Sequence, residues 1–200
     1  MEPERVVEQI YLIRHGETTW SLRGQHTGRS DIPLTARGEA QARHIGERLR
    51  EQLGGESVSA VLVSPMQRAQ RTCELAGFAA QARIEESLRE WDYGLYEGLT
   101  NAEIRQRQAG WDVFHDGCPD GESPAQVTAR VDALLTRLRG VDGTVALFAH
   151  GHLLRSVAVR WIGLSILNGR NLGLDAGTLS ALGYEHRSLD EPAIELWNTR

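Results

Sequence analysis

The stretch YLIRHGET, residues 11–18, begins as a buried β-strand and then changes character. Its apolar start is followed, without a linker, by Arg14 and His15. A second apolar run, VALFAHGH at residues 145–152, also ends in His-Gly. Polar and charged groups at the end of a buried strand need partners, because their burial without partners costs free energy. Both runs therefore indicate a functional site where neighbouring strands finish.

Apolar runs of strand length alternate with amphipathic stretches along the chain. The runs lack a clean apolar–polar alternation, which is typical of strands covered on both faces. The predicted strands are 9–13, 59–63, 144–149, 178–184 and 193–197, and the predicted helices are 35–53, 65–76, 123–139 and 152–162. This alternation predicts an α/β fold, a three-layer α/β/α sandwich with a mostly parallel central sheet.

The two longest predicted helices carry recognisable signals at their ends. Thr35 can cap the start of one helix, and Gly54 follows its last apolar residue. Ser123 can cap the other, with Pro124 at the first helical position. Both helices show an apolar stripe at helical spacing, so we expect each to pack one face on the sheet.

Residues 88–122 interrupt the alternation. The segment is rich in aromatic residues, glycine and aspartate, and we expect a partly helical insertion that forms a small cap over one edge of the sheet. The chain length of 200 residues suits a single domain. We therefore expect one domain, 1–200, with a cap insertion at approximately 88–122. The aromatic residues of 91–114 fit such a cap better than an interface, although a homodimer stays open.

Composition and net charge indicate which kinds of molecule this chain is suited to bind. The chain is 40% hydrophobic and 24% charged, with a formal net charge of −5, which is ordinary for a globular protein. A negative chain does not favour nucleic acid as a partner. No apolar run approaches about 18 residues, so no membrane span or membrane partner is predicted.

The two cysteines and the N-terminus bear on the compartment. Cys73 and Cys118 lie far apart and match neither a metal-binding pair nor a disulfide framework. The first nine residues, MEPERVVEQ, are acidic and lack the apolar segment of a secretory signal. We therefore expect a soluble, cytoplasmic protein in a reducing compartment.

Arginine and histidine residues follow the three clearest predicted strands. Arg14 and His15 end the first, the second leads into a helix with Arg68 near its start, and the third ends in His150. Ligands of parallel α/β sheets bind beyond the carboxyl ends of the strands. Any one of these residues alone is more simply explained as structural or solvated, but four at one edge are not. Two guanidinium groups, two imidazoles and a helix N-terminus form a cradle for a phosphate dianion.

With these residues the chain resembles the histidine phosphatase superfamily, in its phosphoglycerate-mutase-like branch. The matching stretches are LIRHGET (12–18), HTGRSDIPLTARGEAQA (26–42), SPMQRAQRT (64–72), LREWDYGLYEG (88–98), GES (121–123) and FAHGH (148–152). They follow the order of the family over nearly the whole chain. The finer resemblance is to small acid-phosphatase-like and sugar-bisphosphatase-like members, through WS (20–21), REWDYG (89–94), HDGCPDGES (115–123), HGHLLR (150–155) and YEHRSLDEPAIEL (184–196).

The resemblance implies a role for each catalytic position. His15 becomes the nucleophile that accepts the phosphoryl group, and Glu90 becomes the proton donor. Arg14, Arg68 and His150 become the residues that hold the phosphate.

Further residues are expected to contact the substrate. They are Ser21, Gln25, Thr27, Gly28, Tyr93, Gly151, Arg155 and His186. Ser21 stands where many members have Asn, and Arg29 stands where Trp is common, so the substrate preference near this loop is open. Arg155 follows Gly151 by about one helical turn, and it fits either a second phosphate or the surface of its helix.

The chemistry explains why these residue types are needed. Phosphoryl transfer passes through a loose transition state, so catalysis is mostly positioning and electrostatics, and arginines can supply the field without a metal. We expect neighbouring cations to keep His15 uncharged and its second ring nitrogen to donate to a backbone carbonyl. We expect Trp91 and Tyr93 to raise the pKa of Glu90, which then protonates the leaving group and later activates water.

One pair of histidines has a spacing that metal ligands can show. His150 and His152 form an H-x-H pair that could bind zinc, but no clear third ligand accompanies them. We therefore expect no metal and no cofactor. His26 and His44 are interpreted as structural or solvated.

The leading hypothesis is a metal-independent phosphatase that hydrolyses small phosphomonoesters, such as sugar phosphates or bisphosphates, through a phosphohistidine. The alternative enzyme is a cofactor-dependent phosphoglycerate mutase, but EWDYGLYEG (90–98) lacks the extra basic residues that follow this motif in mutases. A non-enzymatic phospholigand-binding protein is disfavoured, because no expected catalytic position is missing.

Overall fold

A computed structural model describes residues 7–200, and six strands of this part of the chain form one sheet in the order β3-β2-β4-β1-β5-β6. The strands are β1 (Val7–Arg14), β2 (Ala60–Val63), β3 (Ala82–Ile84), β4 (Gly143–Ala149), β5 (Leu179–Tyr184) and β6 (Pro192–Thr199). The first four run parallel to one another, whereas β5 runs antiparallel to both β1 and β6. The predicted mostly parallel sheet is confirmed.

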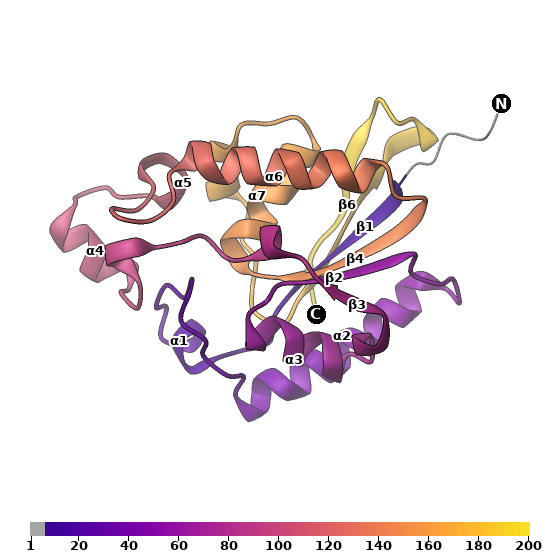
Figure 1. Ribbon diagram of the computed structural model, residues 1–200, viewed down its shortest axis with the longest axis horizontal. Coiled ribbons are helices and arrows are strands. Elements are labelled where there is room, and N and C mark those ends of the chain that lie inside the picture. Colours follow the sequence, from indigo (N-terminus) through magenta and orange to yellow (C-terminus); the bar gives the residue numbers. More distant parts are fainter. Residues whose placement is uncertain (1–6) are drawn as a thin grey trace.

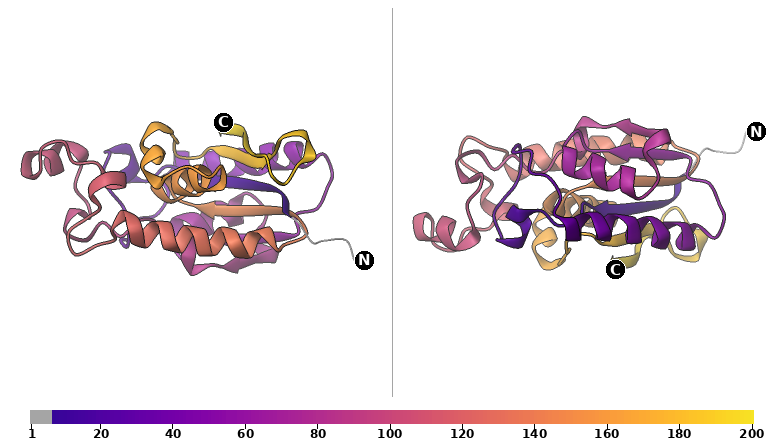
Figure 2. Two further views of the ribbon diagram at one scale, coloured as in Figure 1. Left: turned by 90° about the horizontal axis from the view of Figure 1, so that it is seen from above. Right: turned by 90° about the horizontal axis from the view of Figure 1, so that it is seen from below.

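Helices cover both faces of the sheet (Figures 1 and 2). They are α1 (Thr19–Leu22), α2 (Ala36–Leu53), α3 (Gln67–Leu75), α4 (Asn101–Arg107), α5 (Val113–Asp116), α6 (Pro124–Arg139) and α7 (Gly151–Trp161). Figure 1 shows α6 and α7 above the sheet and α2 and α3 below it. The predicted three-layer sandwich is therefore confirmed.

Strand β1 shows why its sequence is apolar without alternation. Ile10 and Leu12 belong to the hydrophobic cluster on the α6–α7 face, whereas Tyr11 and Ile13 belong to the cluster on the α2–α3 face. All four side chains are buried. Successive residues of a strand point to opposite faces, so a strand between two helical layers needs apolar residues at every position.

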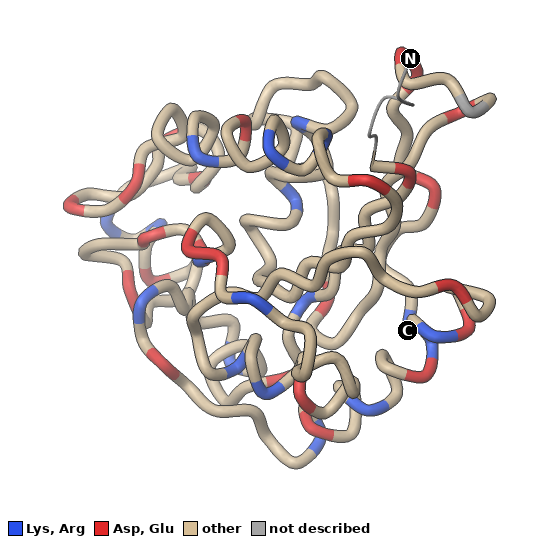
Figure 3. The backbone as a smooth tube through the Cα atoms, turned by 45° about the vertical axis from the view of Figure 1, so that its right-hand side comes forward, with Lys and Arg blue, Asp and Glu red and all other residues tan. Residues whose placement is uncertain are grey.

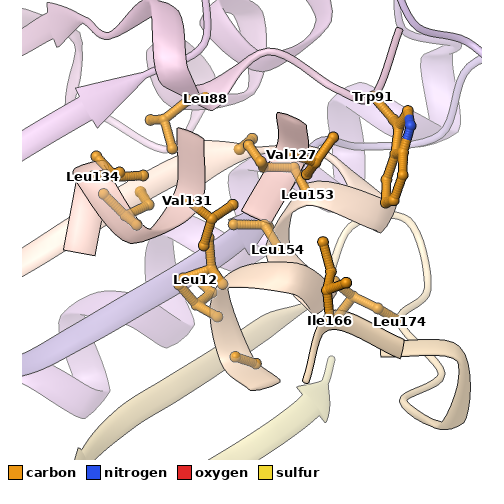
Figure 4. Packing of buried hydrophobic residues seen from close by; sticks show 14 of the residues in the cluster. Leu12, Leu88, Trp91, Val127, Val131, Leu134, Leu153, Leu154, Ile166 and Leu174 are labelled. Atoms are coloured by element: carbon orange, nitrogen blue, oxygen red, sulfur yellow. The ribbon is translucent and has the colours of Figure 1, made fainter. Parts of the chain in front are cut away.

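The cluster on the α6–α7 face extends into the segment 88–122 (Figure 4). The apolar stripe of α6 packs there with Leu12 of β1 and Leu154 of α7, and Trp91 joins the same cluster. The segment contains α4 and α5 and lies beyond the carboxyl ends of the strands (Figure 1). Its first residues are consequently held by the same core that holds the central strands.

The predicted caps of the long helices are confirmed. The Thr35 side chain accepts a hydrogen bond from the backbone of Gly38, and Gly54 ends α2 with a left-handed φ of 59°. Ser123 forms a capping box with Gln126, and Pro124 is the first residue of α6. Each such cap contributes about 1 kcal/mol to helix stability.

Two details differ from the sequence prediction. Helix α3 begins at Gln67 rather than at Pro65, because Met66 keeps an extended backbone with φ −77° and ψ 134°. The edge strand β3 was not predicted, since its three residues are too few to show a period.

Charged residues of both signs are spread along the chain (Figure 3). Several arginines form ion pairs with neighbouring carboxylates, among them Arg71 with Glu39 and Glu74, and Arg160 with Asp132. Within residues 7–200, no helix has both the length and the apolar character needed to cross a membrane.

Both cysteines are buried free thiols. Burial raises the pKa of Cys73 and that of Cys118 to about 12. At neutral pH neither sulfur is a thiolate, so neither is disposed to nucleophilic chemistry.

Helix α2 approaches the backbone at the end of α3 closely at Gly46. A Cβ at this position would overlap the backbone carbonyl of Ala76 and lie 2.6 Å from its Cα atom. We expect Gly46→Ala to lower the free energy of unfolding by about 1–3 kcal/mol through overpacking, although helix propensity alone favours alanine by about 1 kcal/mol. Urea unfolding measures the difference, with Ala40→Gly on the exposed face of α2 as the propensity control. A more stable Gly46→Ala protein would contradict this packing.

Candidate active site

Parallel pairing brings the predicted strand-end residues together. Arg14 pairs with Ala149 in the β1–β4 register, and the backbone N–H of His15 donates to the Ala149 carbonyl at 3.0 Å. The next residue of each strand is then an imidazole, and the rings of His15 and His150 lie 5.2 Å apart between centroids. Arg68 of α3 donates from Nε to Nδ1 of His150 at 3.2 Å. The predicted convergence at one sheet edge is confirmed.

A cavity of about 200 Å³ opens at this edge. Its walls come from β1, the loop around α1, the segment 88–122 and the start of α7. The lining residues are Arg14, His15, Ser21, Gly24, Gln25, His26, Thr27, Glu90, Tyr93, Asn101, Gly151, His152, Arg155 and Leu174.

A larger cavity of about 600 Å³ lies between α3 and the β3 edge of the sheet. Its lining includes Arg71 and Cys73 but no histidine. Arg71 is already paired with Glu39 and Glu74, and the Cys73 thiol is protonated because burial raises its pKa to about 12. The smaller cavity is therefore the candidate active site, since it alone of the two combines imidazole, guanidinium and carboxylate groups.

His15 is held in one tautomer. Its Nδ1 lies 2.8 Å from the Gly16 carbonyl oxygen, which can only accept, so Nδ1 carries the hydrogen and Nε2 keeps its lone pair for the cavity. Burial, and then the charges of Arg68 and Arg14, hold the pKa of His15 well below its usual 6.5. Both the neutral ring and its hydrogen bond to a carbonyl were predicted, but burial lowers the pKa of His15 more than the neighbouring cations do.

Arg14 has a donor to spare. One terminal nitrogen donates to the Leu174 carbonyl, whereas Nε is buried without a hydrogen-bond partner among residues 7–200. A Cβ at Gly151 would approach Nε to 3.3 Å, so glycine at this position leaves room for the guanidinium. A buried, unpartnered N–H of a cation at a cavity wall is suited to bind an anion.

Glu90 is fixed by the N-terminus of α7. Its carboxylate accepts hydrogen bonds from the backbone N–H groups of His152 at 3.0 Å and Leu153 at 2.8 Å, and from that of Trp91 at 3.0 Å. The side chain is only 8% exposed. The sequence predicted aromatic neighbours for Glu90, and the structure adds three backbone donors that no side-chain pattern could have shown.

Arg68 joins α3 to the loop that follows α1. Its NH1 donates to the Ser30 carbonyl at 2.9 Å, and its NH2 donates to the carbonyls of Thr27 and Gly28 at 2.9 and 3.1 Å. With Nε bound to His150, four of the five N–H groups of Arg68 have partners. Arg68 thus places its charge beside His15 and holds this loop, while its direct contact with phosphate stays a prediction.

His150 is also fully engaged. Its Nδ1 accepts from Arg68, so Nε2 carries the hydrogen and donates to the hydroxyl of Ser64 at 2.7 Å. Burial and then the charge of Arg68 hold the pKa of His150 well below its usual value. The ring is therefore neutral and fixed, and the predicted phosphate contact needs one of these bonds to exchange.

The predicted substrate-contacting residues divide into two groups. Six of them line the cavity, namely Ser21, Gln25, Thr27, Tyr93, Gly151 and Arg155. Gly28 lies outside it: its N–H donates to Glu97, and a Cβ there would meet the Trp91 carbonyl oxygen at 2.5 Å. Glycine at this position allows the loop to pack, and a contact of Gly28 with substrate stays a prediction.

His186 lies away from the other predicted residues, and its placement corrects the expectation that it contacts substrate. It lies in the turn after β5, where it is 81% exposed and pairs with Glu191 at 2.8 Å. Because β5 runs antiparallel to β1, with Leu182 opposite Ile10, this turn lies at the amino-terminal end of β1. His186 is therefore at the end of the sheet opposite to the cavity.

Arg155 faces the cavity rather than the surface of its helix. Its Nε donates to the Gly169 carbonyl at 2.8 Å, and its guanidinium lies 4.7 Å from the ring centre of Phe114. Ser21, in contrast, uses its hydroxyl locally, because it donates to the Thr18 carbonyl and accepts from the Thr18 N–H.

Sequence reasoning missed three polar side chains of the wall. His26, interpreted as structural or solvated, is buried and lines the cavity. His152 also lines it, and its Nδ1 lies 2.5 Å from the Tyr93 hydroxyl. Asn101 accepts from Nε2 of His26 at 3.0 Å. The proximity of His26 to Thr27 and of His152 to His150 was an available signal, whereas Asn101 had none. His44 is exposed, as predicted.

The cavity contains no ready-made metal site. Among the described residues 7–200, no three His, Cys, Asp or Glu side chains are grouped to hold a metal ion. In the H-x-H pair, Nδ1 of His150 accepts from Arg68 and Nδ1 of His152 contacts Tyr93. A guanidinium beside His150 also disfavours a cation there.

Comparisons with known proteins agree with this geometry. The family model of the histidine phosphatase superfamily (branch 1) matches residues 10–200. An acid phosphatase of Mycobacterium tuberculosis is 39% identical over 180 residues, which cover 89% of this chain and 87% of that protein. A sedoheptulose 1,7-bisphosphatase of Saccharomyces cerevisiae is 30% identical over 245 residues, 92% of this chain and 90% of that protein. The solved structure of the open reading frame Rv3214 of M. tuberculosis has a TM-score of 0.87 at 35% identity, covering 96% of this chain and 97% of that one.

The buried histidines predict how stability depends on pH. Burial lowers the pKa of His15, His26, His150 and His152 below the usual 6.5. Below about pH 6.5 the unfolded chain takes up protons that the folded chain does not, so the free energy of unfolding falls as the pH decreases. Each histidine contributes a slope of up to about 1.4 kcal/mol per pH unit.

Urea unfolding between pH 7.5 and 5 measures this slope. His152→Gln removes one of the buried rings and should make the slope shallower, whereas His44→Gln, at an exposed position, should leave it unchanged. An equally steep slope for His152→Gln would contradict the assignment of a neutral ring.

Proposed function

This chain belongs to the histidine phosphatase superfamily (branch 1), and we propose that it hydrolyses small phosphomonoesters without a metal, through a phosphohistidine at His15. One observation carries the proposal. A neutral imidazole with a free Nε2, a buried guanidinium with an unpartnered Nε and a fixed carboxylate share one small cavity. The acid phosphatase and the bisphosphatase described above support hydrolysis over other fates of the phosphoryl group.

In the first step, Nε2 of His15 attacks phosphorus and the bond from phosphorus to the ester oxygen breaks. The guanidinium of Arg14 and the nearby charge of Arg68 stabilise the negative charge that spreads over the three equatorial oxygens. The leaving oxygen takes a proton from the carboxyl of Glu90 and departs as an alcohol, and the phosphoryl group remains on His15. Nδ1 keeps its hydrogen during this step and continues to donate it to the Gly16 carbonyl oxygen.

In the second step, water attacks the phosphorus of the phosphohistidine. Glu90, now a carboxylate, takes a proton from this water, the bond from phosphorus to Nε2 breaks and inorganic phosphate leaves. Both His15 and Glu90 return to their starting states. The backbone hydrogen bonds at the start of α7 keep the carboxyl group in place throughout.

The size and charge of the cavity support a sugar phosphate or bisphosphate as substrate. A volume of about 200 Å³ lies below the range of about 300–1,000 Å³ common for drug-sized ligands. Arg155 adds a second cationic group to the lining, and within the described part of the chain only its Nε donates a hydrogen bond. This arrangement suits a compact substrate with a second anionic or polar group.

The mutase alternative is less well supported. A mutase must shield its phosphohistidine from water until the product accepts the phosphoryl group. The acid phosphatase reported above, whose name describes hydrolysis, is more similar in sequence to this chain than a relative named as a probable phosphoglycerate mutase. Incubation with 3-phosphoglycerate distinguishes the two reactions, because hydrolysis releases phosphate whereas a mutase forms 2-phosphoglycerate.

Loss of the nucleophile tests the mechanism directly. We expect His15→Ala to lower kcat with p-nitrophenyl phosphate by at least about 10³-fold, because the covalent path is closed. The wild-type activity should withstand EDTA, and the quenched wild-type enzyme should carry acid-labile, alkali-stable phosphate. His44→Ala, at an exposed position, is the matched control. Full activity of a folded His15→Ala protein would refute the mechanism.

Replacement of the proton donor should depend on the leaving group. We expect Glu90→Gln to lower kcat by about 10²–10⁴-fold for alkyl phosphates, whose alkoxide needs a proton. The loss in the phosphorylation step should be smaller for p-nitrophenyl phosphate, since nitrophenolate departs without protonation. Rapid-quench measurement of the nitrophenolate burst isolates this step. An equal loss for both substrates would contradict the role of Glu90 as the acid.

A further inference from the structure

We propose that Gln25 and Asn101 together recognise a hydroxyl group of the substrate, so that the enzyme selects small polyol or sugar phosphates over unhydroxylated alkyl phosphates. This inference rests on the proposed function and assigns the part of the cavity that does not bind phosphate. Both residues line the cavity that contains His15 and Glu90.

The amide of Gln25 has a defined orientation. Its Nε2 donates to the Gly98 carbonyl at 2.7 Å, and the reversed amide would place two oxygens against each other. Oε1 is consequently the acceptor, and it is buried without a hydrogen-bond partner among residues 7–200. A buried acceptor without a donor costs about 1–3 kcal/mol, which a ligand hydroxyl would recover.

Asn101 offers the complementary group. Its Oδ1 accepts from Nε2 of His26 at 3.0 Å, which fixes the amide and leaves the two N–H groups of Nδ2 as donors. The amide presents Oδ1 to this ring, and because an amide oxygen can only accept, Nε2 of the neutral imidazole carries the hydrogen. Within the described part of the chain, no acceptor is bonded to Nδ2 of Asn101.

The backbone brings the two amides to the same wall. Gln25 forms an isolated antiparallel bridge with Thr100, the residue before Asn101. The next residue, His26, donates its backbone N–H to the Leu99 carbonyl at 2.9 Å and binds Asn101 through its ring. The loop after α1 and the start of α4 are therefore joined at this point, with one amide from each.

A hydroxyl group matches this pair because it donates one hydrogen bond and also accepts. Other uncharged groups of the lining already bind within the protein: the Tyr93 hydroxyl lies 2.5 Å from Nδ1 of His152, and the hydroxyls of Ser21 and Thr27 donate to the backbone carbonyls of Thr18 and Gln25. Arg14 and Arg155 are cations that suit anionic oxygens instead. The amide pair is thus the part of the cavity best suited to a neutral hydroxyl.

Selectivity follows from the cost of an unpaired buried group. A site that hydrogen-bonds a hydroxyl rejects an analogue without it, because the acceptor of the site then stays unsatisfied. We expect wild-type kcat/KM to favour a hydroxylated phosphate over its deoxy counterpart by at least about 10-fold.

Matched substrate pairs test the inference. The pairs are glycerol 3-phosphate with n-propyl phosphate and erythritol 4-phosphate with n-butyl phosphate, and phosphate release gives kcat/KM for each. Gln25→Met, which removes the acceptor at similar size, should bring the ratio close to one. Asn101→Asp keeps an oxygen for His26 but loses the donor, and it should lower the ratio as well. Gln52→Met, exposed on α2, should keep the wild-type ratio.

The outcomes separate this inference from the proposed function. Hydrolysis of p-nitrophenyl phosphate that depends on His15, together with ratios near one for both pairs, would overturn hydroxyl recognition and leave the phosphatase intact. A wild-type ratio that persists in folded Gln25→Met, as judged by its thermal unfolding, would overturn the assignment to this residue. Absence of hydrolysis of every ester would instead refute the proposed function.

Discussion

The parallel pairing of β1 with β4 is the constraint on which the site depends. It sets Arg14 opposite Ala149 and lets the His15 N–H bind the Ala149 carbonyl. The residues after both strands consequently leave the sheet side by side, and α7 starts directly beside Arg14. A shift of one residue would exchange the side chains that β1 presents to the two helical layers and would move His15 out of line with His150. The register that buries the core is therefore the same register that assembles the nucleophile and its charges.

Helix α7 extends this constraint to the segment 88–122. Its first backbone N–H groups donate hydrogen bonds to the carboxyl group of Glu90 and fix its position. Trp91 follows Glu90 into the hydrophobic cluster shared with α6 and α7. The carboxylate is thus positioned by a helix terminus on one side and by a packed aromatic residue on the other. Glu90, the acid, and His15, the nucleophile, come from segments far apart in sequence, yet both are positioned by backbone groups at the end of β4 and the start of α7.

Much of this arrangement was predictable, because the relevant signals are local. The apolar run before Arg14 indicates a strand covered on both faces, and the Ser123–Pro124 pair marks a helix start. Strand ends then indicate where the catalytic residues meet. The unpredicted features arise from contacts at long range. The position of His186 depends on β5 being antiparallel, and the role of Asn101 depends on a bridge between two loops. Neither relation leaves a periodic trace in the sequence.

The loop after α1 is attached to the rest of the molecule in two different ways. On one side Arg68, which is fully buried, donates hydrogen bonds to three of its carbonyl groups. On the other side it is joined to the start of α4 by a backbone bridge and by the ring of His26. Backbone attachment is indifferent to side-chain identity, so the loop can exchange residues that face the ligand while its path is preserved. Substitutions in two short segments could therefore change which substrates this fold binds, without disturbing the strands that position the catalytic residues.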